Sequence, residues 1–230
     1  MKTVVNVLLG LFIVGLVWIC VASIMGPINF KEEKDARDEV VKERLLQIRD
    51  AQREYRRQKA TYTDNFDTLI NFVKTGKMSV VAKQGELTDQ QLEDGMTERK
   101  AMTIINKAKK SYGDKWQSAK EVVAAGLQGF VRDTVWVNII DTLFAKGFTP
   151  DSMRYVPLVG AKFDMAIKND TLDNGTPRNF FEASTPYTVY LNGLDKQEIA
   201  NAIDIDQKLG KFPGMMVGSL ENPIDAGNWE

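Results

Sequence analysis

The side chains best suited to chemistry are few in this chain, because histidine is absent. The 230 residues contain no histidine and a single cysteine, Cys20. Catalytic sites built on Ser-His or Cys-His pairs and His-ligated metal sites are therefore excluded. Carboxylate pairs, a lysine base or a carboxylate calcium site remain open, but no phosphate-binding glycine loop, nucleophile elbow or EF-hand pattern occurs. We expect a non-catalytic protein without a cofactor or metal, and we nominate no catalytic residue.

One acidic cluster could suggest a cation site. Asp170, Asp173 and Asn174 stand just before Gly175. Calcium prefers carboxylate and amide oxygens, but a calcium loop of the EF-hand kind also needs a distal bidentate glutamate, and none lies at the required offset. A turn is the better interpretation of this cluster.

Charge is balanced along the chain. Lys and Arg number 30 against 31 Asp and Glu, giving a formal net charge of -1. This balance argues against a general nucleic-acid or anionic-lipid surface, and we expect no nucleic-acid partner. Lys107, Lys109 and Lys110 form a small basic cluster, but Glu98 and Asp114 flank it. A solvated helix face is favoured there over an anion or lipid site.

The most pronounced feature is the apolar run from Val4 to Met25, VVNVLLGLFIVGLVWICVASIM. As a helix it would span roughly 33 Å, about the thickness of a bilayer's hydrocarbon core. A cleaved secretory signal has a shorter apolar region, of about 7 to 15 residues, and a small-x-small cleavage site. Val17-Trp18-Ile19 before Cys20 also lacks the small residues of a lipobox. We therefore expect a single membrane-spanning anchor.

The flanks of this run bear on its orientation. Lys2 precedes it, whereas Lys31, Lys34 and Arg37 follow among acidic residues. Basic residues alone favour a cytoplasmic downstream side, but large domains are translocated largely regardless of charge. A short leader with one lysine is typical of an anchor whose N-terminus stays inside. We expect a single-pass inner-membrane protein with a cytoplasmic N-terminus and a periplasmic or otherwise extracytoplasmic C-terminal domain.

A second helix is predicted from Lys31 to Ala60, which contains neither Gly nor Pro. Gly26-Pro27 is expected to kink or break the chain before it. The predicted helix carries a narrow seam at alternating spacings of four and three residues. The seam residues are Val41, Leu45, Ile48, Gln52 and Tyr55. This seam could pack on the chain's own head, form a dimeric coiled coil or pack with helices of partner proteins.

The stretch that follows carries a resemblance. Ile48 to Tyr55 has the pattern I-x-x-A-x-x-x-Y, Tyr62 lies in the next turn, and Asp64 or Asn65 can cap a short helix ending at Gly76. This arrangement resembles type IV pilins and secretion pseudopilins, in which a long N-terminal helix carries an antiparallel sheet. The resemblance implies a subunit that assembles with other envelope proteins.

The resemblance covers about the first 75 residues, but this chain lacks the pilin processing motif. Pilins have a basic leader ending in Gly, followed by F-T-L-x-E, whereas Thr3-Val4-Val5-Asn6-Val7 stands here. No glutamate lies in the apolar run. The anchor, the helix and the stretch T-D-N-F-D-T-L-I-N-F-V-K also resemble uncharacterised single-span envelope proteins, a likeness that implies no activity.

Helices dominate up to Gly129 and strands after it. Met78–Ala82 is expected as a short strand, and Thr88 as the cap of a helical run. Phe130–Ile140, continued by Asp141–Phe144, begins an expected antiparallel sheet of about four strands. Its other strands are expected at 152–158, 162–167 and 180–184, followed by a helix at 194–205 and a last short strand at 215–218.

These patterns predict an α+β protein with four parts. They are an anchor (1–27), a long helix with a short second helix (28–76), a helical region (77–129) and a sheet domain (130–230). We expect a non-catalytic structural or assembly subunit of an envelope complex, with the membrane, other envelope proteins or further copies of the chain as partners. The alternative is a tethered module that binds a peptide, glycan or envelope protein through an exposed sheet edge. Trp229 is expected to pack on its own domain or to contact a partner.

Overall fold

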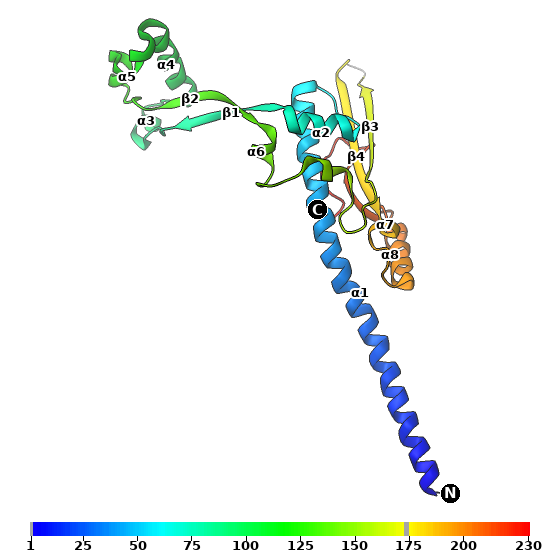
Figure 1. Ribbon diagram of the computed structural model, residues 1–230. Coiled ribbons are helices and arrows are strands. Elements are labelled where there is room, and N and C mark those ends of the chain that lie inside the picture. Colours follow the sequence, from blue (N-terminus) through cyan, green and yellow to red (C-terminus); the bar gives the residue numbers. More distant parts are fainter. Residues whose placement is uncertain (1, 173–174) are drawn as a thin grey trace. The chain divides into compact units, whose positions relative to one another are not determined.

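The chain is α+β, as expected, and one long helix dominates it (Figure 1). The computed structural model describes residues 2–172 and 175–230, without the side chains of residues 2–8 and 22. Helix α1 runs from Lys2 to Lys59 and contains Pro27. The expected break at Gly26-Pro27 is therefore wrong. A proline removes one backbone hydrogen bond of a helix, and the helical residues on both sides of Pro27 keep their own hydrogen bonds.

The first half of α1 carries the apolar run. It is the one helix in the described chain that is long and apolar enough to cross a membrane, and none of that apolar stretch is buried. Phe12 is 63% exposed and Trp18 76% exposed. An apolar surface of this extent is stable only when lipid or another protein covers it.

The chain divides into two compact units, and their boundaries differ from the expected ones. The anchored unit comprises Met1–Gly76 and Ile140–Glu230, and the inserted unit comprises Lys77–Ile139. The inserted unit thus interrupts the sequence of the anchored unit between α2 and α6.

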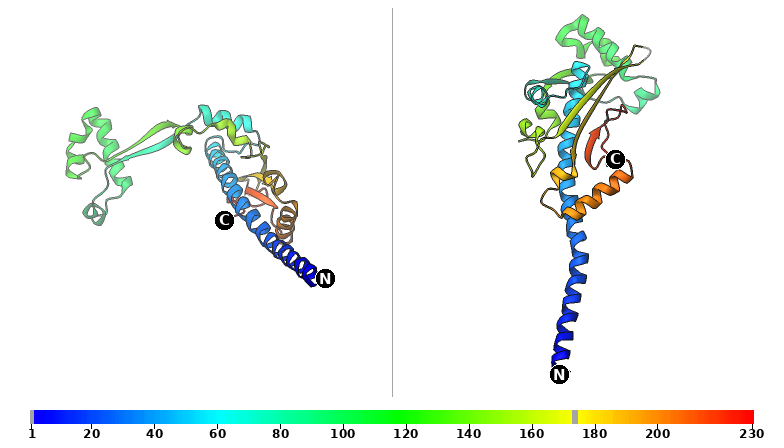
Figure 2. Two further views of the ribbon diagram at one scale, coloured as in Figure 1. Left: turned by 60° about the horizontal axis from the view of Figure 1, so that its bottom comes forward. Right: turned by 90° about the vertical axis from the view of Figure 1, so that its right-hand side faces the viewer.

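A three-stranded antiparallel sheet and the second half of α1 form the anchored unit (Figure 2). The sheet order is β3-β4-β5, with β3 at Asp164–Thr171, β4 at Pro177–Pro186 and β5 at Gly214–Gly218. In the register Ile167 lies opposite Phe181, and Ala183 lies opposite Val217. Phe181, Ala183 and Val217 are buried where α1 packs on β4 and β5.

Short helices complete the anchored unit. Asn65 caps α2 by accepting hydrogen bonds from the Asp67 and Thr68 amides, as expected, and Asp195 caps α8 in the same way. The helices are α2 (Phe66–Thr75), α6 (Ile139–Leu143), the 3₁₀ helix η2 (Pro150–Arg154), α7 (Tyr187–Tyr190) and α8 (Lys196–Lys208).

Two expected strands are wrong. Residues 152–158 form η2 and turns, with only an isolated bridge between Tyr155 and Lys162. Pro150 at the start of η2 has the φ that favours a helical turn, which outweighs the β-forming side chains that follow. Asp141 to Phe144 does not continue a strand either, because helix α6 begins at Ile139.

The inserted unit is a two-stranded antiparallel ribbon that carries a helical cluster. Strand β1 (Lys77–Gln84) pairs with β2 (Val131–Asn138) over eight residues each. The grouping of β2 with the C-terminal sheet is therefore wrong. The helices between the strands are α3 (Asp89–Glu93), α4 (Glu98–Tyr112), η1 (Gly113–Ser118) and α5 (Lys120–Ala124).

The helical cluster has its own core. Ile105, Trp116, Val122 and Phe130 are among its buried members. The expected cap at Thr88 is confirmed as a capping box, in which Thr88 and Gln91 each bond the other's backbone amide. This core defines the inserted unit as a module with its own packing.

Candidate functional site

The helix seam is already covered by the chain itself. Val41, Leu45, Ile48 and Gln52 have no exposed surface, and Tyr55 is half-buried. The Tyr55 ring meets Phe72 edge-on at 5.1 Å between ring centroids. Of the alternatives left open by the sequence, packing on the chain's own head is what the structure shows. The seam residues therefore contribute to the core of the anchored unit.

Trp229 also packs within its own unit. Its ring lies against the backbone of Gly227, where an added Cβ would come within 2.3 Å of ring carbons. Gly227 in turn bridges to Val217 of β5, and the Asn228 amide donates to the Met216 carbonyl at 3.0 Å. The segment 226–229 thus covers the outer edge of β5, and of the two possibilities left open for Trp229 the structure shows packing on its own unit.

Ion pairs with α1 hold this segment. The Arg53 guanidinium donates two hydrogen bonds to the Asp225 carboxylate, one of them 2.7 Å long. These bonds hold the pKa of the Asp225 carboxyl below its usual range. Arg49 pairs with Glu230 at 3.2 Å. The segment 225–230 is therefore fastened to the sheet edge and to the helix.

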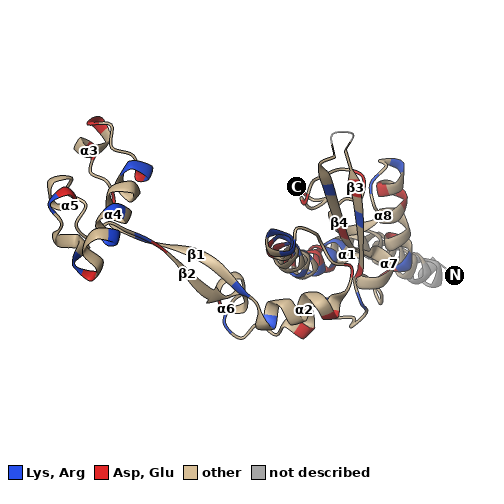
Figure 3. Cartoon of the chain, turned by 90° about the horizontal axis from the view of Figure 1, so that it is seen from above, with Lys and Arg blue, Asp and Glu red and all other residues tan. Residues whose placement is uncertain are grey.

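Asp170 of the acidic cluster and Lys109 of the basic cluster make contacts within the chain. Asp173 and Asn174 lie outside the described residues, and the Asp170 carboxylate accepts a hydrogen bond from the Thr171 amide. No group of carboxylate or cysteine side chains able to hold a metal occurs in the described ranges. Lys109 pairs with Asp133 at 2.9 Å and lies over the Trp116 ring. Basic and acidic positions both occur in each of the two units (Figure 3).

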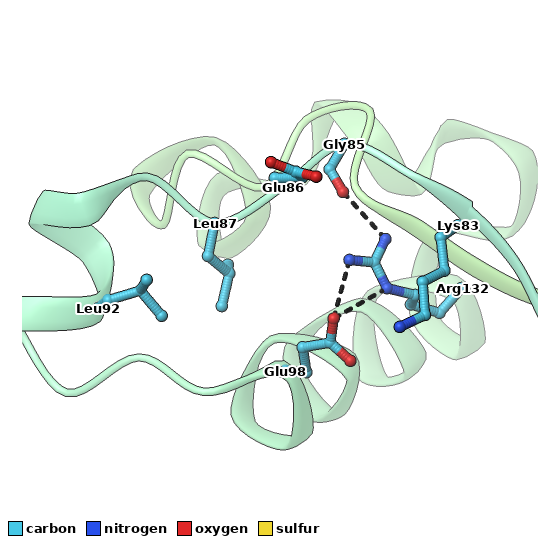
Figure 4. A pocket seen from close by; sticks show the side chains of 7 residues that line it. All are labelled: Lys83, Gly85, Glu86, Leu87, Leu92, Glu98 and Arg132. Atoms are coloured by element: carbon cyan, nitrogen blue, oxygen red, sulfur yellow. Dashed lines mark hydrogen bonds and ion pairs between the residues drawn. The ribbon is translucent and has the colours of Figure 1, made fainter.

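A groove of about 360 Å³ lies between the end of the ribbon, the loop that follows β1 and the first turn of α4 (Figure 4). Arg132 crosses it and donates to Glu98 at 3.0 Å and to the carbonyl of Gly85 at 3.0 Å. The Arg132 guanidinium lowers the pKa of the Glu98 carboxyl, with a smaller effect from Lys83. Because the Arg132 side chain is only 9% exposed and bonded on several sides, it ties the first turn of α4 to the ribbon and offers no ready anion site.

The ribbon itself carries the exposed apolar surface of the inserted unit. Trp136 is 66% exposed, Val81 50% and Val135 42%. Val81 lies opposite Thr134, and Trp136 lies opposite Ser79, so the side chains of Val81 and Trp136 project from the same face of the ribbon. Val135, which lies opposite Val80, projects from the other face. We call Val81, Val135 and Trp136 the ribbon surface.

Sequence patterns indicate this surface only in part. Both strands were expected, and β1 was expected at nearly its observed place, but their mutual pairing was not. Apolar side chains on both faces of a strand normally indicate burial on both sides. A two-stranded ribbon covers neither face, so the exposure follows only from the pairing.

No protein-family model, curated protein or solved structure matches this chain.

Proposed function

We propose that the protein is a non-catalytic structural or assembly subunit of a membrane-anchored envelope complex, and that it contacts its partner through the inserted unit. The observation that carries the proposal is the ribbon surface, with Trp136 66% exposed in a free two-stranded ribbon. Isolated ribbons are marginally stable in water, and exposed aromatic side chains are frequent anchors of protein interfaces.

The membrane anchor is consistent with the same function. The apolar run of α1 is unburied and long enough to span a membrane, which supports a single-pass anchor. We propose that this anchor lies in the inner membrane and that the head lies outside the cytoplasm. We further propose that the subunit is pseudopilin-like in layout only, with an N-terminal helix whose second half packs on an antiparallel sheet. Since the seam is buried within the chain, assembly would use the inserted unit in place of the helix face.

Excision of the inserted unit tests the proposal. Lys77 and Asn138 are paired at the base of the ribbon, so their backbones lie side by side and a short Asn-Gly turn can replace residues 77–138. We expect the excised protein to insert into membranes and to keep the fold of the anchored unit, but to run as a lone species after gentle detergent extraction. The full chain should run in a larger complex of defined composition.

A single substitution tests the same proposal without removing the inserted unit. Trp136→Ala should remove the complex while leaving the folding of the chain intact, because the side chain is exposed. Trp116→Phe, within the buried core of the same unit, serves as the matched control that should retain the complex. An unchanged complex in both the excised protein and Trp136→Ala would overturn the proposal.

A further inference from the structure

A hollow of about 170 Å³ lies on the helical cluster, where α4 and α5 pack together (Figure 1). Its lining residues are Ile104, Lys107, Ala108, Ser111 and Tyr112 of α4 and Glu121 of α5. The first four of these stand at positions i, i+3, i+4 and i+7 of one helix. Four residues at this spacing form the hole that receives a side chain of a facing helix. The hollow therefore has the geometry of a helix–helix contact site.

The hollow exists because a small side chain stands between two large ones. Ala108 is only 4% exposed and packs into the core of the cluster, and Ile104 and Tyr112 lie one turn before and one turn after it. Pockets for small molecules typically enclose about 300–1,000 Å³. Because this hollow is smaller, it suits one side chain of a partner protein better than a cofactor or metabolite.

The rim of the hollow carries one charge of each sign. Lys107 and Glu121 are both exposed, and within the described chain neither makes an ion pair with the other or with a third residue. The neighbouring Lys109 differs, because it is paired with Asp133. Two unpaired charges of opposite sign at a contact site favour a partner surface that also carries both signs.

The chain itself provides a surface of this kind. A twofold axis brings the same surface of two copies together, so a contact from the first to the second copy is repeated in reverse. Lys107 of one copy can then meet Glu121 of the other, and the reverse pair forms as well. Tyr112, which is 51% exposed at the end of the same face, is a side chain that can enter the hollow of the second copy. The surface is thus self-complementary in shape and in charge.

We propose that α4 and α5 bind a second copy of the chain through this hollow, which makes the inserted unit a symmetric dimerisation module. The inference goes beyond the proposed function, because it concerns other elements of the inserted unit than the ribbon surface and names their partner. The proposed membrane anchor raises the effective concentration of the copies, so a small contact can suffice.

Charge reversal tests the dimer. The full chain is studied in detergent, light scattering gives the number of copies, and two different affinity tags report mixed dimers. We expect the native chain to be a dimer. Lys107→Glu alone or Glu121→Lys alone should weaken it at least about tenfold, because each variant places like charges at both contacts. An equimolar mixture of the two variants should form mixed dimers, since every contact then joins opposite charges. The doubly reversed chain, with both substitutions, should also recover the dimer.

Lys110→Glu is the matched control. It makes the same change of charge on an exposed position of α4 that does not line the hollow, so the dimer should persist. Tyr112→Ala should weaken the dimer without unfolding the chain, because the ring is half exposed. A monomeric native chain, or a dimer that both single charge reversals leave unchanged, would overturn the inference. So would single variants whose loss of the dimer is recovered neither in the mixture nor in the doubly reversed chain, because the two charges would then face another protein.

The two proposals can fail separately. If the native chain is a monomer but excision of the inserted unit removes its complex with other proteins, the assembly function stands and the dimer is wrong. If excision leaves that complex intact while the charge reversals behave as expected, the dimer stands and the assembly function is wrong.

Discussion

The side-chain amide of Gln52 pairs with both backbone polar groups of Thr63. Its Nε2 donates to the Thr63 carbonyl, and its Oε1 accepts from the Thr63 amide at 3.2 Å. Both residues are buried. The seam of α1 includes one polar position because the segment after the helix passes next to Gln52. The buried backbone of Thr63 in that segment needs a hydrogen-bond partner there.

Gln52→Leu should destabilise the anchored unit. The substitution keeps the side chain's approximate size but leaves the buried N–H and C=O of Thr63 without their partners, which we expect to cost about 2–4 kcal/mol. Thermal or urea unfolding of the full chain in detergent measures the change. Gln207→Leu on α8, where the side chain is exposed, is the matched control. Similar stability of the two variants would contradict the role assigned to Gln52.

Leu45→Ala should affect folding and leave partner binding by the folded protein unchanged. Leu45 is fully buried, and truncating such a side chain typically costs about 2–5 kcal/mol. Val40→Ala on the same helix is the control, because Val40 is 42% exposed. Unfolding of both variants, combined with the size of the extracted complex below the unfolding transition, separates the two effects. A lost complex with unchanged stability would restore the seam as a partner surface.

Trp229→Ala and Trp136→Ala should have opposite effects. Trp229 packs on Gly227 and is half-buried, so its removal should lower the stability of the anchored unit by about 1–3 kcal/mol. Trp136 is 66% exposed, so its removal should change stability by less than about 0.5 kcal/mol while it weakens partner contact. Unfolding curves and complex size, measured on both variants, check the pair. A stable Trp229→Ala variant that loses its complex would show that Trp229 contacts a partner.

The sequence predicted most reliably what depends on neighbouring residues. Thr88 could be recognised as a helix cap, and the cap of α2 could be narrowed to Asp64 or Asn65, because a capping oxygen serves amides two or three residues away. The seam could be recognised because helical periodicity places its residues on one face.

Long-range relationships could not be predicted in this way. Strand propensity in 131–138 indicates a strand but not its partner, and that partner, β1, lies about fifty residues earlier. The same limit applies to the seam, since its period is the same whether the covering surface is the chain's own sheet or another protein. The ribbon surface is exposed because of a pairing that the local pattern does not specify.

The ion pair between Arg53 and Asp225 makes stability depend on pH. The Arg53 guanidinium lowers the pKa of the Asp225 carboxyl in the folded chain below that of the unfolded chain, where Asp titrates at about 3.9. The pair therefore stabilises the fold above that value, and the contribution is lost as the pH falls through the folded-state pKa. Because Arg53 is 48% and Asp225 35% exposed, we expect only about 0.5–1 kcal/mol at neutral pH.

Asp225→Asn measures this contribution. The variant should be less stable than the native chain at pH 7, and the difference should shrink as the pH falls below about 4, where the native carboxyl also becomes neutral. Asp204→Asn is the control, because its pair with Lys208 is a more exposed pair within one helix. Unfolding at a series of pH values gives the comparison. The difference in unfolding free energy between the native chain and Asp225→Asn would contradict this account if it stayed the same down to pH 2. The carboxylate charge would then not hold this segment on α1, and the backbone bonds of Asn228 would do so.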